Sequence, residues 1–384
     1  MRRPIDAIVT GFTRNAELAR HAFAPLRQLR QEGLVRSIRY VTWSSDEIDA
    51  LVAPIAAMAD VETTRLPMPA AYGNARQKGV TWQVRNLDAA LSLVPEDDAL
   101  VLKLRPDFVI DASFLKSKLT TFETFSEIDT AADAFGVSLP LPPFSRKMWI
   151  PWADANQPFF YEDAAFMGLK RDLKLLVPQD LENRLGILDD PACGTFVHVV
   201  RWGSVMVPRF PIFARYLQEF GGFLNDIAYR RTLIPVLLDD PFFWHLIVAN
   251  AWILWTGFHI DCGKTGELLF FANNVNKDAD WNKLRKLKTA PPYDDVARWR
   301  VATRANMGLL PAVDCLYGRL TDDAWPRAMF TLAHPDVPLA TRAQISLVLS
   351  HYETGALSAV EDAFYEKLAR HHRNWAAQTV AQSA

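Results

Sequence analysis

Apolar residues in the first hundred positions recur with two alternating periods. Short apolar or β-branched runs predict strands at Ala7–Val9, Ser37–Trp43, Val61–Leu66 and Ala99–Leu104. Apolar residues at helical spacing between them predict helices over Asn15–Leu34, from the Ser44–Asp46 cap cluster to Met58, and over Asn74–Leu93. Strands that alternate with helices in this way are typical of an α/β domain with a parallel, doubly wound sheet.

The predicted strands end at Gly11–Asn15, Trp43–Asp46 and Arg105–Asp107. Ligands of open α/β sheets bind outside the carboxyl ends of the strands, so we expect a functional site among these three segments. Pro140–Pro158 is rich in proline and aromatic residues and lacks a period, which predicts a long loop of the kind that covers such sites. Phe159–Leu169 then returns to the sheet.

The second half of the chain shows mainly helical patterns. Phe242–Ile260 is strongly apolar and follows Asp240 and Pro241, a favourable N-cap and first helical residue, so we predict a buried helix. Its length is also close to that of a membrane span, but internal polar residues and the lack of flanking basic residues favour burial in the protein. We therefore expect an α/β domain over residues 1–177 and a mostly helical region over 178–384.

Composition narrows the class of protein. Half of the 384 residues are hydrophobic, 22% are charged and the net charge is −2, which disfavours sequence-independent binding to nucleic acid. Cys193, Cys262 and Cys315 are far apart, which argues against a zinc site or a disulfide framework and favours the cytoplasm. The first residues, MRRPIDAIVTGF, have a short apolar run and no small-residue cleavage site, so we expect a first strand there and no signal peptide.

The run VLKLRPDFVI, Val101–Ile110, carries the clearest chemical signal. An apolar strand that ends in Arg105 and Asp107 places a carboxylate at the rim of a sheet, where α/β enzymes hold a metal and a diphosphate. The alternative is an ordinary turn, in which Asp107 bonds the backbone and Arg105 lies on the surface.

Five fragments occur in a telling order: IVTGFTRN, IRYVTWSSDEI, NARQKGVTWQVRNLDAAL, LVLKLRPDF and FYEDAAFMG. Together they resemble bacterial GT-A-type glycosyltransferases of the WavE-like lipopolysaccharide-synthesis kind. The resemblance covers roughly residues 5–170. It implies a Rossmann-like GT-A domain that binds a nucleotide-diphospho-sugar donor and transfers the sugar to a saccharide or lipid-linked saccharide acceptor.

The resemblance also implies a divalent metal, Mn²⁺ or Mg²⁺, at a two-acid motif that ends at Asp107. Arg105 replaces the first acid of that motif in this chain. An arginine can pair with a phosphate through two parallel hydrogen bonds, so Arg105 is a candidate to replace part of the cation's charge.

Glu162 and Asp163 resemble the acidic element that supplies the base in inverting GT-A enzymes, with Asp163 favoured as the catalytic base. An inverting transfer needs a carboxylate that accepts the proton of the acceptor hydroxyl. The alternative reading makes Asp163 the N-cap of a helix that starts at Ala164.

Further candidates for donor and acceptor binding come from several segments. Each has a structural alternative: a strand-to-helix turn, a core tryptophan or a solvated helix face. GFHIDCGKTG has five residues between Gly257 and Gly263 where a phosphate loop has four, and it follows an apolar helix, so we expect no phosphate loop there. Lys264 and His259 stay candidates to reach the diphosphate from the C-terminal side. The donor-binding candidates are Gly11, Phe12, Arg14, Asn15, Trp43, Asn74, Gln77, Arg85, Arg105 and Lys264, and the acceptor-binding candidates are Trp202 and Phe210.

These observations predict a cytoplasmic glycosyltransferase of bacterial surface polysaccharide synthesis, with peripheral contact to the inner face of the membrane. Two alternatives stay open. A nucleotidyltransferase shares a similar sheet, but its first loop is richer in glycine and basic residues than IVTGFTRN. A non-catalytic carbohydrate-binding or scaffold protein would explain Arg105 as decay of the acidic motif.

Overall fold

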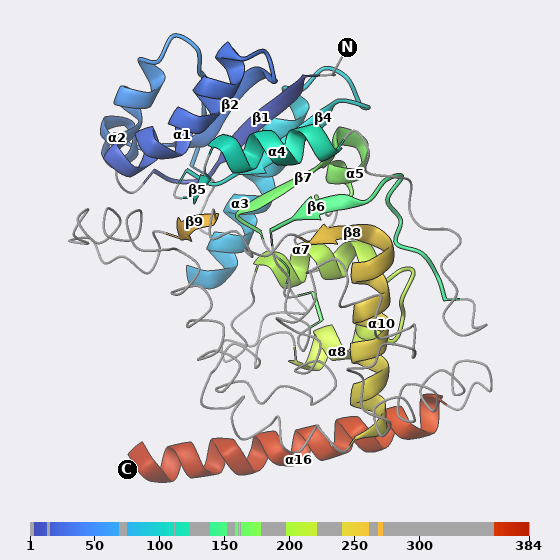
Figure 1. Ribbon diagram of the computed structural model, residues 1–384. Helices are drawn as coiled ribbons and strands as arrows, with labels where there is room; N and C mark the ends of the chain where they lie inside the picture. Colours follow the sequence, from blue (N-terminus) through green and yellow to red (C-terminus); the bar gives the residue numbers. More distant parts are fainter. Residues whose placement is uncertain are drawn as a thin grey trace.

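The structure is a computed structural model of the 384-residue chain. It describes residues 4–13, 16–68, 75–106, 108–110, 112–122, 139–151, 158–159, 161, 163–177, 197–220, 240–260, 268–271 and 357–383. These residues form a central sheet with helices on both of its faces (Figure 1).

The main sheet has seven strands in the order β3-β2-β1-β4-β7-β6-β8. The strands are β1 (Ile5–Thr10), β2 (Val35–Ser44), β3 (Glu62–Pro67), β4 (Leu100–Leu104), β6 (Met148–Ile150), β7 (Ala165–Leu169) and β8 (Phe258–Ile260). The first four strands along the chain pair in parallel, whereas β7 runs antiparallel to both β4 and β6. A separate antiparallel pair joins β5 (Phe108–Ile110) to β9 (Leu268–Phe271). The α/β, Rossmann-like fold class predicted from the sequence is confirmed, but the expected parallel sheet is mixed, because β7 runs antiparallel to its neighbours.

Helices cover the sheet as two layers. The helices are α1 (Ala16–Gln31), α2 (Asp46–Ala56), α3 (Ala75–Ser92), α4 (Ala112–Phe122), α5 (Lys170–Lys174), α7 (Val197–Met206), α8 (Phe213–Phe220), α10 (Pro241–Gly257) and α16 (Leu357–Ser383). Buried side chains of α1, α2 and α4 share one core with one face of the sheet, and those of α3, α5, α7, α8, α10 and α16 share a second core with the other face. β8 and α7 lie beyond residue 177 but belong to this sheet and this core. The predicted domain boundary at residue 177 therefore stays a prediction.

Local sequence signals explain where the first helices begin and end. Ser45 caps α2 by accepting a hydrogen bond from the backbone N–H of Ile48 at 3.4 Å. Gly33 follows α1 with a φ of 74°, a conformation that costs glycine little. The helix predicted over Asn74–Leu93 is α3 within a residue or two, so these predictions are confirmed.

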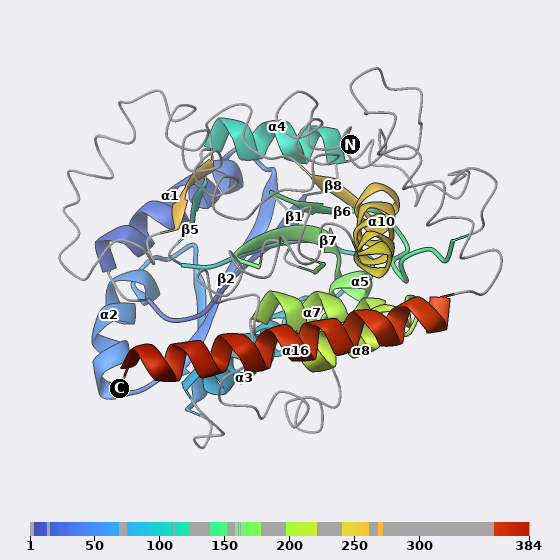
Figure 2. The ribbon, with the colours of Figure 1, turned by 90° about the horizontal axis from the view of Figure 1, so that it is seen from below.

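The apolar segment Phe242–Ile260 divides into a helix and a strand. Asp240 caps α10 by accepting the backbone N–H of Phe242 at 3.1 Å, as predicted, and Pro241 opens the helix. The segment ends as strand β8, which pairs with β6, so the prediction of one continuous helix was wrong at its end. Among the helices that the structure describes, none is both long and apolar enough to cross a bilayer. Figure 2 shows α16 lying across the molecule near one end of α10. The two helices are in contact.

Two further sequence expectations need correction. Pro140–Pro158 was predicted to be a loop, but its residues Met148–Ile150 form β6, which is held in the sheet by its fully buried side chains. Asp163 was alternatively expected to cap a helix at Ala164. No helix starts there, because strand β7 begins at Ala165 and pairs with β4.

A buried ionic network lies at the amino end of β1. The Asp6 side chain, 1% exposed, accepts hydrogen bonds from Arg36 at 2.5 Å, Arg39 at 3.1 Å and Ser37 at 2.5 Å. Burial alone would raise the pKa of Asp6, but these hydrogen bonds and the charge of Arg36 lower the pKa below its ordinary value. This network joins β1 to β2 at the end opposite the predicted site.

Candidate functional site

The loop after β1 is braced by a tyrosine and requires glycine. Gly11 has a φ of 121°, and its N–H donates to Val41 O at 3.2 Å. The hydroxyl of Tyr40 donates to Gly11 O at 3.1 Å and lies 2.6 Å from Oγ1 of Thr13. A Cβ at Gly11 would lie 3.6 Å from Cδ of Pro106, so this loop lies directly beside the end of β4 that Arg105 and Pro106 follow.

Helix α3 forms one wall of this region. The ring of Phe12 meets the ring of Trp82 edge to face, with centroids 5.2 Å apart. One turn further along α3, the buried Asn86 side chain has no hydrogen-bond partner for either amide atom among the described residues. Trp43, at the end of β2, is also buried, and its Nε1 has no hydrogen-bond partner among the described residues. Arg85, another predicted donor-binding residue, is exposed on the same helix.

Antiparallel pairing brings the two acidic fragments of the sequence together. Leu104 of β4 pairs with Ala165 of β7, so the end of β4 lies beside the start of β7. Arg105 follows the first of these residues and Asp163 precedes the second. Residues about sixty positions apart in the sequence therefore share one edge of the sheet, as a common site requires.

Two buried cations converge on the backbone of Asp163. Nζ of Lys103 donates a hydrogen bond to the carbonyl oxygen of Asp163, and Nη1 of Arg201 donates to the same oxygen at 3.4 Å. Both cations also lie over the ring of Phe166, at 5.0 Å for Lys103 and 5.3 Å for Arg201. We call Lys103 and Arg201 the cationic clamp. It joins β4 and α7 to the segment that carries the Asp163 carboxylate.

Arg201 is unusual because its guanidinium is fully buried, with 0% of the residue exposed. Nε and Nη2 have no hydrogen-bond partner among the described residues. Burial lowers the pKa of Arg201 to about 10; the Asp163 carboxylate opposes this shift and the charge of Arg105 adds to it. Arg201 remains protonated at neutral pH, so Asp163 lies in a region of positive potential.

The described residues around Asp163 do not fit a divalent cation. Within the part of the chain that the structure describes, no three His, Cys, Asp or Glu side chains lie together as a metal site would need. The backbone of Asp163 bonds Lys103 and Arg201, and the charge of Arg105 acts on Arg201 as that of Asp163 does. Like charges repel, so basic neighbours disfavour a metal at this carboxylate.

Several predicted site residues lie outside the described residues, and one is described only in its backbone. The first group consists of Arg14, Asn15, Asn74, Asp107, Glu162 and Lys264. Gln77 lies in α3, where the structure describes only its backbone. The structure brings together Gly11 and Arg105 through Pro106, and Arg105 and Asp163 through the β4–β7 pairing. The roles of all these residues stay predictions.

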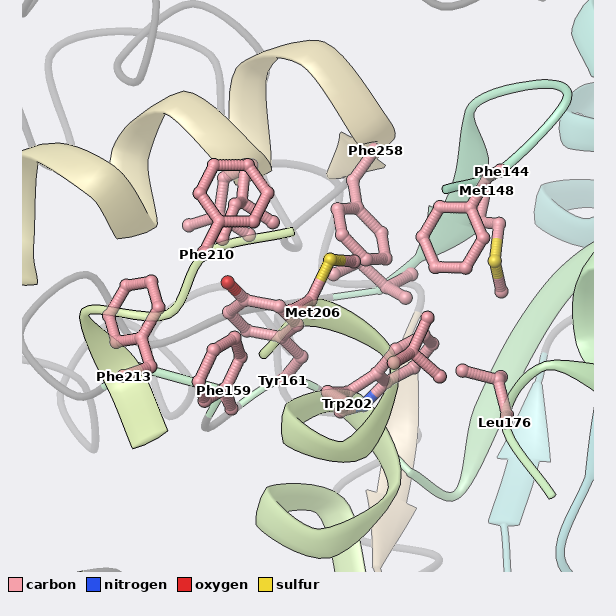
Figure 3. Packing of buried hydrophobic residues seen from close by; sticks show 14 of the residues in the cluster. Phe144, Met148, Phe159, Tyr161, Leu176, Trp202, Met206, Phe210, Phe213 and Phe258 are labelled. Carbon is pink, nitrogen blue, oxygen red and sulfur yellow. The ribbon is translucent and has the colours of Figure 1, made fainter. Parts of the chain in front are cut away.

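Trp202 and Phe210, the predicted acceptor-binding aromatics, are buried in the core, at 0% and 4% exposure. The Trp202 ring lies 5.9 Å from that of Tyr161 and 5.3 Å from that of Phe258, in the cluster drawn in Figure 3. Tyr161 in turn donates to Oδ1 of Asn250 on α10 at 2.5 Å. In this structure the two aromatics contribute to core packing, and their acceptor role stays a prediction.

The sequence reasoning did not single out Lys103, Arg201 or Trp82. Lys103 is the charged residue inside an otherwise apolar strand, and Arg201 is the one charged side chain in the apolar helix VHVVRWGSVM. A lone cation at a buried position is the signal that identifies both, because burying a charge is costly without partners. Trp82 offered no such signal.

Comparisons with known proteins assign no family to this chain. No protein-family description matches the sequence, and no curated protein does. Solved structures with a similar course of the chain include a 4-diphosphocytidyl-2C-methyl-D-erythritol synthase from Anaerococcus prevotii, with 10% identity, coverage of 57% of this chain and 100% of that one, and a TM-score of 0.29. Mouse xyloside xylosyltransferase 1 has 10% identity, covers 54% and 82%, and gives a TM-score of 0.25. TarS from S. aureus has 11% identity, covers 91% and 92%, and gives a TM-score of 0.27.

Proposed function

We propose that this chain is a glycosyltransferase that uses a nucleotide-diphospho-sugar donor. The single observation that supports this best is the pairing of β4 with β7, which brings Asp163 and Arg105 to one edge of the sheet, with Lys103 and Arg201 bonded to the backbone of Asp163. A glycosyl transfer needs both kinds of group. The Asp163 carboxylate takes a proton from the acceptor, and the charge of Arg105 stabilises the diphosphate that leaves.

The location agrees with this chemistry. The strand order β3-β2-β1-β4 changes direction between β1 and β4, and such switch points bind nucleotides in doubly wound sheets. Gly11 and Pro106 meet at this point, with Arg105 next to them. The partly exposed Arg105 is the proposed partner of the donor diphosphate, while Gly11, Phe12 and Trp43 are proposed to surround the nucleoside.

In the proposed reaction the acceptor hydroxyl oxygen attacks the anomeric carbon of the donor sugar. The bond from that carbon to the phosphate oxygen breaks, and its electron pair leaves with the nucleoside diphosphate. The acceptor proton passes to the Asp163 carboxylate. This course inverts the anomeric centre. The proposal also includes Asp107 as a metal ligand and Glu162 as a second acid. Both roles rest on the resemblance of the sequence fragments.

The finer assignment is a saccharide or lipid-linked acceptor of bacterial lipopolysaccharide or capsule synthesis. It is supported by the resemblance of the ordered sequence fragments.

The test is donor hydrolysis without an acceptor. The protein is incubated with a panel of nucleotide sugars, with and without Mn²⁺, and released nucleoside diphosphate is measured. We expect at least one donor to be hydrolysed. A nucleotidyltransferase would instead release pyrophosphate from a nucleoside triphosphate and a sugar phosphate, and a binding protein would give neither product.

A further inference from the structure

The cationic clamp has a geometry that a general electrostatic role would not require. Lys103 comes from β4 and Arg201 from α7, yet both donate to one backbone oxygen, that of Asp163. A carbonyl oxygen has two lone pairs, and here two charged donors use them. Hydrogen bonds from charged donors are roughly twice as strong as neutral ones.

The ring of Phe166 lies against both members of the clamp. The ring of Phe166 contacts each cation and also packs edge to face against Trp202, at 5.6 Å between centroids. Phe166 is also in β7, directly paired with Lys103 across the sheet. The three side chains, from β4, α7 and β7, therefore fix the segment before β7, although Asp163 itself lies in no helix or strand.

Burying the two cations of the clamp costs free energy of folding, and a function of the clamp would explain why the cations are there. Lys103 and Arg201 are 1% and 0% exposed, and the guanidinium leaves two of its nitrogens without a described partner. Apolar side chains of similar size often stabilise such a position equally well or better. Placement of the Asp163 carboxylate is a function that an apolar side chain could not provide, because it could not donate to the carbonyl.

We propose that Lys103 and Arg201 are positioning residues that hold Asp163 in place for proton transfer from the acceptor. This rests on the proposed function, in which Asp163 is the base. The two cations act through Asp163 and do not contact the donor. Their removal should therefore lower turnover while donor affinity changes little.

A double-mutant cycle tests this separation. The variants are Arg201→Lys, Asp163→Asn and the pair of both, with the exposed Arg209→Lys as a control on the segment that follows α7. We expect Arg201→Lys to lower kcat about tenfold or more with donor KM within about twofold, and Arg209→Lys to change neither. In the Asp163→Asn background, Arg201→Lys should have no further effect, because residues that act as a unit are not additive.

Additive losses, or a raised donor KM with kcat preserved, would overturn the proposal and make Arg201 a donor ligand. A change in melting temperature with unchanged kcat would make Arg201 a packing residue only and would also overturn it. If Arg201→Lys does not fold, Phe166→Leu replaces it in the cycle, with the same outcomes required.

A readout without turnover separates this inference from the proposed function. Hydrogen exchange of the peptide around Asp163 to Leu169 should increase in Arg201→Lys and not in Arg209→Lys, whether or not a donor is found. Faster exchange in a protein that hydrolyses no donor would keep the clamp and reject the glycosyltransferase. Unchanged exchange in an active enzyme would reject the clamp and keep the function.

Discussion

Lys103 donates a hydrogen bond to the backbone carbonyl of Asp163, a residue 60 positions later in the chain. The bond exists because β7 returns antiparallel to β4, so that the end of one strand meets the start of the other. It connects the strand that Arg105 follows to the residue whose carboxylate we propose as the base.

Gly11→Ala should reduce both stability and donor affinity. Alanine at a φ of 121° is strained by about 1 to 3 kcal/mol, although its Cβ would make only an ordinary van der Waals contact with Pro106. Gly33→Ala is the matched control, because Gly33 also has a positive φ, 74°, but has nothing within 4 Å of an added Cβ and lies away from the site. Chemical denaturation and calorimetry with nucleoside diphosphates measure both effects. Equal donor affinity in the two variants would contradict a donor role for this loop.

Arg105→Gln should weaken nucleoside diphosphate binding by about 10-fold to 100-fold, because a charge-assisted hydrogen bond contributes about 1.5 to 3 kcal/mol. Calorimetry in EDTA isolates the contribution of the side chain from that of any metal. The exposed Arg209→Gln serves as control for the change in net charge. Binding that is unaffected in Arg105→Gln would favour the alternative reading of Arg105 as a surface turn residue.

Asp6→Asn should lower the free energy of unfolding by about 3 kcal/mol at pH 7, because it leaves Arg36 and Arg39 without their buried partner. The pKa of Asp6 is lowered on folding, so the network stabilises the protein above the unfolded pKa of about 3.9, and this contribution is lost as pH falls through the folded pKa. The variant should therefore lose less stability on acidification than the natural chain. Glu62→Gln, at a position 62% exposed and paired with Arg39, should change stability by less than about 0.5 kcal/mol. Parallel acid dependence in Asp6→Asn and the natural chain would be inconsistent with this network.

Trp202→Ala should cost about 3 to 5 kcal/mol of stability, since the ring is fully buried among aromatic side chains. Trp202→Phe is the variant that examines its acceptor role, because it keeps most of the packing. A raised acceptor KM at an unchanged melting temperature would support direct acceptor contact. An unchanged KM would leave packing as its whole contribution.

The sequence predicted the elements of the first half well because each is encoded locally. Ser45, Gly33 and the Asp240–Pro241 pair stop or start helices through their own side chains or backbone freedom. Strand β6 was missed because three residues in a proline-rich stretch show no period, and only its neighbours β7 and β8 make it a strand. The end of α10 was misjudged for the same reason, since pairing with β6 turns Phe258–Ile260 from helix to strand.

The candidate site shows the same division. Asp163 and Arg105 were found as separate motifs, and their proximity depends on the antiparallel register of β4 and β7, which periodicity does not reveal. Arg201 lies on a helix whose packing places it at Asp163, so its role depends on tertiary contacts alone.

The most direct test of the proposed base is the turnover of Asp163→Asn with the donor identified by hydrolysis. The amide keeps the size of the side chain but cannot accept the acceptor's proton at neutral pH. We expect kcat to fall at least about 100-fold with donor affinity and melting temperature nearly unchanged. The control is Asp172→Asn, a buried carboxylate that bonds Ser145 at 2.7 Å and should lower stability without lowering kcat. Normal turnover in folded Asp163→Asn would contradict the account and leave Glu162 or a retaining mechanism as the alternatives.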